Sequence, residues 1–254
     1  MSAIGFRIPP EHLLELAQRG AQDAPRFDTP AGAYRQWSVG AGVELWLQQN
    51  AAEHMVGCNP HFAGQGRLEV ALIETVSVSG RPLDGHGFGW AAPRDPGNPY
   101  SGLHSFAANL PDFAFVDERI LIPSVVTLQV AAFTASLESF PTETAFMESE
   151  LGQAFQAEDG SRPWQQSEDE GLPRPEAFIV GQVASCELRA NPITGQEFYA
   201  LLVRTESGSI DVVSDLETSP RRPATGAIIA GSFWLSARPV GELPAARTPA
   251  PETE

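Results

Sequence analysis

Alternating apolar and polar positions are most regular in the last third of the chain. Four segments there are rich in β-branched and aromatic residues and are separated by turn residues: Phe178–Arg189, Glu197–Thr205, Ser209–Ser214 and Ala227–Arg238. The second of these segments carries apolar residues on both of its alternating faces. This pattern predicts a central strand or the wall of a small barrel, because either position buries both faces.

The number and spacing of these strands resemble an OB-type, partly open barrel. That fold needs five strands, whereas only four are expected between residues 177 and 240. A long apolar segment of the N-terminal part, 124–137, is the candidate for the fifth strand. In that arrangement the two halves of the chain would form one integrated unit.

Residues 1–155 are predicted to form a β-rich domain with a short N-terminal helix. Two prolines followed by leucines at helical spacing favour a helix over 9–19, and a second helix is expected from Thr142 to about Ala157. The segments predicted as strands are Gly42–Gln49, Leu68–Ser79, Phe113–Phe115 and Ser124–Leu137. The expected fold class is therefore mainly β with a few short helices.

Residues 80–111 contain a dense cluster of glycines and prolines. Such residues interrupt regular structure, so we expect a long loop here. The loop also carries four aromatic residues, Phe88, Trp90, Tyr100 and Phe106, which are too many for a disordered segment. We therefore predict an ordered, packed excursion that could cover a ligand.

Two further segments are expected to lie outside the folded domains. Residues 156–176 are acidic, polar and interrupted by three prolines, which predicts a linker to the OB-like barrel at 177–240. Residues 241–254 are rich in Pro, Ala and Glu and are expected to form a disordered tail.

The charge of the chain excludes several classes of function. The 254 residues include 32 acids and 16 basic residues, all of them Arg, for a formal net charge of −16. Without lysine there is no Schiff-base lysine and no Walker-type phosphate loop. The excess of acids argues against nucleic acid and anionic membrane surfaces as partners, since both attract basic residues.

The sequence also favours a soluble, cytoplasmic protein. Cys58 and Cys186 are too few and too far apart for a disulfide framework. The N-terminus lacks a basic region followed by an apolar region, and no apolar stretch is long enough to span a membrane.

A group of metal-ligating residues suggests one chemical hypothesis. His54, Cys58 and His61 form an H-x3-C-x2-H spacing, and Asp84 and His86 follow in the glycine-rich segment. Imidazole and thiolate ligands at such spacing could bind a divalent metal such as Zn²⁺, with His86, Asp84 or water in the fourth position. The alternative is that these are ordinary loop and hairpin residues, with Cys58 a small buried apolar group.

Aromatic residues supply the candidates for a ligand-binding surface. His86 and Trp90 lie in the glycine-rich loop, and Tyr199 and Trp234 lie on strands of the barrel. Bases could stack on barrel aromatics, but only a few arginines accompany them. No G-x-S-x-G motif marks a catalytic serine, and a Ser–His–Asp set can be assembled from any sequence of this length.

We therefore consider three functions. The first is a binding or interaction protein without evident catalytic motif. Its partner would be another protein, a small molecule or a second copy of the chain in a homo-oligomer, and would bind near Trp90 or Trp234. The second is a metal-dependent enzyme using His54, Cys58, His61 and His86. The third is a single-stranded nucleic-acid binder that uses the barrel. The absence of motifs favours the first over an enzyme.

Overall fold

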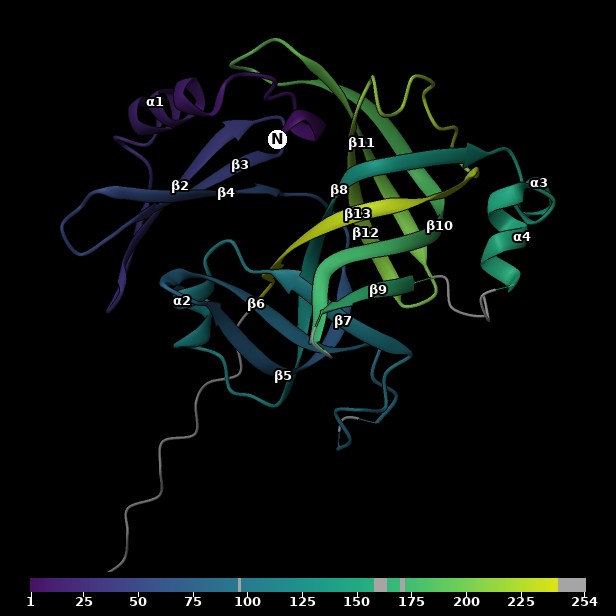
Figure 1. Ribbon diagram of the computed structural model, residues 1–254, viewed down its shortest axis with the longest axis horizontal. Helices are drawn as coiled ribbons and strands as arrows, with labels where there is room; N and C mark the ends of the chain where they lie inside the picture. The colour runs from purple at the N-terminus through teal and green to yellow at the C-terminus, as the bar shows by residue number, and fades with distance from the viewer. Residues whose placement is uncertain (96, 158–163, 170–171, 242–254) are drawn as a thin grey trace, which may run out of the picture.

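The computed structural model describes residues 1–95, 97–157, 164–169 and 172–241, and it is mainly β (Figure 1). The helical elements are η1 Ser2–Ile4, α1 Pro10–Gly20, α2 Phe113–Asp117, α3 Glu143–Met147 and α4 Glu150–Ala157. The helix expected over 9–19 is confirmed as α1. Within the described residues, no helix is long and apolar enough to cross a membrane.

The strands form two sheets. The first sheet has the order β1 Arg26–Thr29, β2 Gly32–Gly40, β3 Val43–Gln49 and β4 Met55–Phe62. The second has nine strands: β5 Leu68–Val78, β6 Arg81–Ala91, β7 His104–Asn109, β8 Ser124–Phe140, β9 Trp164–Asp169, β10 Leu172–Ala190, β11 Glu197–Thr205, β12 Gly208–Asp215 and β13 Ile228–Pro239.

Strand β3 is buried on both faces of the first sheet. Val43, Leu45 and Leu47 pack in an apolar cluster with residues of α1, which lies over this sheet in Figure 1. The residues between them, including Trp46 and Gln48, face the second sheet and are also buried. Because side chains alternate along a strand, β3 joins the apolar cluster near α1 on one side to the main core cluster, with the polar groups of Glu44 and Gln48, on the other.

The longest pairing of the second sheet joins β8 to β13. The two strands run antiparallel, with partners from Ile228–Phe140 to Pro239–Leu128. Strand β8 also pairs in parallel with β12. Pairings from β10 to β11, β12, β8, β13 and back to β10 therefore form a closed circuit.

A second circuit uses the same two strands. Pairings run from β5 to β6, β7, β13, β8 and back to β5. Each circuit contains three consecutive antiparallel strands, β5–β7 or β10–β12, followed by a long fourth strand, β8 or β13. The third strand of each set pairs in parallel with the fourth strand of the other set: β7 with β13, and β12 with β8. No internal repeat is evident in the sequence, so the repetition lies in the pairing pattern.

The prediction that 80–111 lacks regular structure is wrong, because β6 and β7 lie within it. The glycines of β6 are explained by close packing on one face. A Cβ at Gly85 would overlap the ring of Phe113, and one at Gly89 would overlap the carbonyl oxygen of Ala71 on β5. The glycines therefore serve close approach within the sheet and do not end the strand.

Two other predicted elements also need correction. Phe113–Phe115 is part of helix α2, in which the buried residues Phe113 and Val116 recur at helical spacing. The helix expected up to Ala157 is present but divided into α3 and α4. The N-terminus of α3 is capped by Thr142, whose Oγ1 accepts a hydrogen bond from the backbone N–H of Ala145 at 3.1 Å.

The segment 156–176, predicted as a linker, contains strand β9 and the first residues of β10. Trp164 is buried and stacks on His104 at a ring-centroid distance of 4.9 Å, which anchors β9 despite its polar composition. The remaining residues 158–163 and 170–171 lie outside the described residues, as does nearly all of the predicted tail at 241–254.

Substitution of Gly89 tests the close approach of β6 to β5. We expect Gly89→Ala to lower the free energy of unfolding by about 3 kcal/mol, because a backbone carbonyl cannot move aside. Gly87→Ala is the matched control, since its Cβ would lie 3.2 Å from Leu72 Cδ2 and 3.4 Å from Leu110 Cδ1. Urea denaturation that finds equal effects of the two substitutions would contradict this packing.

Candidate functional site

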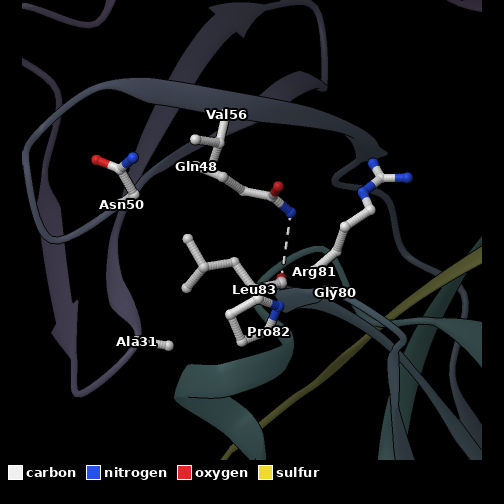
Figure 2. A pocket seen from close by; sticks show the side chains of 8 residues that line it. All are labelled: Ala31, Gln48, Asn50, Val56, Gly80, Arg81, Pro82 and Leu83. Carbon is white, nitrogen blue, oxygen red and sulfur yellow. Dashed lines mark hydrogen bonds between the residues drawn. The ribbon is translucent and has the colours of Figure 1, made fainter.

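A pocket opens between the β3–β4 hairpin and the start of β6. Its volume is about 180 Å³. Figure 2 shows side chains from both sheets around it. The apolar lining residues are Ala31, Val56, Pro82 and Leu83, and the polar ones are Gln48, Asn50 and Arg81. Apolar walls with a few placed polar groups are typical of small-ligand sites.

Asp84 lies behind this pocket and organises its polar side. Its Oδ1 accepts hydrogen bonds from the side-chain amides of Gln48 and Asn59, the latter at 2.9 Å. Its Oδ2 forms an ion pair with Arg81 Nη2 at 2.6 Å. The side chain of Asp84 is only 6% exposed, and these partners offset the cost of burying its charge.

The backbone beneath the pocket is fixed at Leu83. Its carbonyl oxygen accepts hydrogen bonds from the hydroxyl of Tyr34 at 2.7 Å and from Gln48 Nε2 at 3.1 Å, the second of which is drawn in Figure 2. The Tyr34 hydroxyl in turn accepts from the backbone N–H of Ala114 on α2 at 2.9 Å. Burial strongly raises the pKa of Tyr34, so it stays a neutral donor.

The rim of the pocket carries the groups that could meet a ligand. Asn50 Oδ1 accepts hydrogen bonds from the backbone N–H groups of Ala52 and His54, each at 3.0 Å, which orients the amide. The side chain of Arg81 is 62% exposed, and Val56 is 51% exposed. The opening therefore combines a cation and an amide with an apolar surface.

The four residues predicted to bind a ligand do not line this pocket. His86 and Trp90 share one face of β6 and are half-buried. Tyr199 is buried in the main core, whereas Trp234 packs on Phe133 in the other apolar cluster, with ring centroids 5.3 Å apart. Neither Trp90 nor Trp234 is among the large apolar residues that the structure shows as exposed.

The predicted metal ligands are not brought together either. His54 is exposed before β4. Cys58 and His61 are three positions apart on β4 and so point to opposite faces. Cys58 packs in the apolar cluster near α1, where burial raises the pKa of its thiol to about 12. In the described part of the chain, no group of three or more His, Cys, Asp or Glu residues is arranged to bind a metal.

His61 instead belongs to a buried hydrogen-bond chain between the two sheets. Its Nε2 lies 2.6 Å from Gln129 Oε1, and its Nδ1 lies 2.9 Å from Ser236 Oγ. Gln129 Nε2 donates to Asp211 at 2.7 Å, so Oε1 is left to accept from the imidazole. Both ring nitrogens are therefore occupied, and His61 is held as a neutral imidazole.

The residues of the pocket carried no recognisable signal in the sequence. Gln48 and Arg81 belong to no motif, and the sequence marks Asp84 only as a possible metal ligand close to His86. Comparison with protein-family models, curated proteins and solved structures finds no match. The assignment of this pocket as the candidate site therefore depends on its geometry alone.

The buried state of His61 predicts how stability depends on pH. Burial, with a smaller contribution from Arg238, lowers the pKa of His61 from 6.5 to about 3. The unfolded chain then binds a proton below pH 6.5 that the folded protein does not bind until about pH 3. Stability contributed by neutral His61 is present above pH 6.5 and is lost as the pH falls.

We expect the wild-type protein to lose about 2 kcal/mol from this residue between pH 6.5 and 4.5. In His61→Gln, which lacks the titrating group, urea denaturation should show a correspondingly smaller loss. His54→Gln is the exposed control and should keep the wild-type pH dependence. An identical pH dependence in wild type and His61→Gln would show that His61 titrates normally.

Proposed function

We propose that the protein binds a short aliphatic carboxylate in the pocket at the start of β6, and that this pocket has no catalytic role. The observation that carries the proposal is the pocket itself, with its apolar walls and the Arg81 guanidinium at its mouth. The ligand could be a free acid or the C-terminal residue of a partner protein, since both present the same chemistry.

The size of the pocket limits the ligand. A volume of about 180 Å³ is below the roughly 300–1,000 Å³ of pockets for drug-sized molecules. It suits one branched aliphatic chain, in contact with Val56, Pro82 and Leu83. A larger cofactor would not be enclosed by these walls.

The charge at the mouth favours a carboxylate. Arg81 has five N–H donors, and the ion pair with Asp84 leaves others available. Asn50, drawn across the pocket from the Arg81 guanidinium in Figure 2, offers an amide nitrogen, because its oxygen is already bonded to the backbone. The chain as a whole is strongly acidic, so this local cation would select anions that are small enough to enter.

The strand pairings also support an OB-like arrangement for the C-terminal half. In order, β10, β11 and β12 are antiparallel, β12 pairs in parallel with β8, and β13 closes on β10. We infer that β8 is the fifth strand of this OB-like barrel and β13 its fourth. The proposed ligand pocket lies outside this circuit, and the fold by itself does not assign a function.

The test uses two probes that differ only in charge, N-acetyl-leucine and N-acetyl-leucinamide. We expect isothermal titration to show binding of the acid and binding about ten-fold weaker of the amide, because only the acid forms a charge-assisted bond. In Arg81→Gln the two probes should bind alike. Equal affinity for both probes in the wild type would contradict the carboxylate assignment.

A bulky side chain in the pocket provides a second test of the same proposal. Ala31→Phe should fill the pocket and abolish binding of N-acetyl-leucine. Ala224→Phe, at an exposed position away from the pocket, should leave binding unchanged. If neither probe binds the wild type, or if Ala31→Phe binds normally, the pocket is not the site.

A further inference from the structure

A second Ser–His pair lies far from the pocket, where three strands meet. His104 begins β7, and Ser207 occupies the turn between β11 and β12. Ser207 Oγ lies 3.0 Å from His104 Nε2. Trp164 of β9 stacks on the imidazole with the two ring planes 17° apart. The pair is thus assembled from segments about a hundred residues apart in the chain.

The imidazole is oriented as a general base. His104 Nδ1 lies 2.9 Å from the carbonyl oxygen of Ser105. A carbonyl oxygen can only accept a hydrogen bond, so Nδ1 carries the proton. The lone pair of Nε2 is then directed at the hydroxyl of Ser207, which donates to it. A nucleophile, a base and a group that orients the base are therefore in place.

The buried pair Ser236–His61 has the same chemistry and provides a comparison. There the imidazole also accepts from a serine and donates to an oxygen, but serine and histidine are almost completely buried. Ser207 is 8% exposed and follows the exposed residue Glu206 in the turn. Of the two pairs, the one at Ser207 keeps more exposure, with His104 at 6%, whereas His61 is 1% and Ser236 0% exposed.

The turn also offers a donor for a developing negative charge. Among the described residues, the backbone N–H of Ser207 makes no hydrogen bond. In chymotrypsin-type serine proteases the backbone N–H of the nucleophile is one of the donors that bind the oxyanion. Thr205 Oγ1 lies 3.2 Å from Ser207 Oγ and adds a second polar group beside it.

We propose that Ser207 is a nucleophile activated by His104, and that this second site transfers acyl groups from small esters. As the bond forms between Ser207 Oγ and the acyl carbon, the hydroxyl proton passes to His104 Nε2. The same proton then goes to the alkoxide that leaves when the ester bond breaks. Water, deprotonated in the same way, releases the acid and restores the serine.

Labelling with a fluorophosphonate tests the proposal directly. Ser207 Oγ should form a bond to phosphorus as fluoride leaves, and the serine proton should pass through His104 to solvent. We expect intact-mass analysis to show one adduct per chain and peptide mapping to place it on Ser207. Ser207→Ala should remain unlabelled, and Ser209→Ala, two residues away, should label like the wild type.

The substitution His104→Gln distinguishes a catalytic role of His104 from a purely structural one. Glutamine can still accept the Ser207 hydrogen bond through its amide oxygen, but it cannot take the proton. We expect its labelling rate to fall at least about 100-fold while its melting temperature changes little. Full-rate labelling of a folded His104→Gln, an adduct elsewhere or no adduct in the wild type would overturn the proposal. None of these outcomes depends on the ligand pocket at Arg81.

Discussion

The antiparallel pairing of β8 with β13 is the constraint on which the rest of the structure depends. Its register covers twelve pairs, from Ile228–Phe140 to Pro239–Leu128. Both closed circuits of strands include this pair, so neither circuit can form without it. Apolar side chains from both sets of strands accordingly meet in one core cluster, including Leu72, Leu128 and Leu235. Figure 1 shows the two strands crossing the middle of the molecule.

The outer face of this pairing also determines how the first sheet is attached. Arg238 of β13 bonds to Asp112 at 2.9 Å and lies 4.1 Å from the centre of the Trp46 ring. On the same face of β13, Ser236 meets His61 of β4. Such buried polar contacts are costly when mismatched, so they fix one position of the sheet. That position creates the pocket between β3, β4 and β6.

Much of the fold could be predicted from local patterns. The helix α1 and the C-terminal strands follow from periodicity and turn residues, whereas residues 124–137 were proposed as a partner of those strands only because an OB-type barrel needs a fifth strand. Strand β6 could not be predicted, because its glycines look like breaks until Phe113 and Ala71 are seen against them. Strand β9 could not be predicted either, since the buried Trp164 anchors a segment whose composition is otherwise polar.

The candidate sites were less predictable than the fold. Arg81 and Gln48 belong to no motif, and they meet only because the first sheet packs on the second. Ser207 and His104 are separated by more than a hundred residues and are joined by a turn that contacts β7. The metal-ligating residues expected from the sequence, by contrast, are separated, because His54 precedes β4, Cys58 and His61 lie on opposite faces of β4, and His86 lies on β6. Spacing along the chain therefore said little about which side chains share a site.

We infer that β8 and β13 join the strands on both sides of them into one cooperative unit. Native-state hydrogen exchange measured along the chain in increasing urea tests it most directly. We predict that the slowest-exchanging amides lie in β8 and β13, and that those of β5 and β10 converge with them on a single global unfolding free energy. Separate unfolding of β5–β7 and β10–β12, each with its own free energy, would contradict the claim.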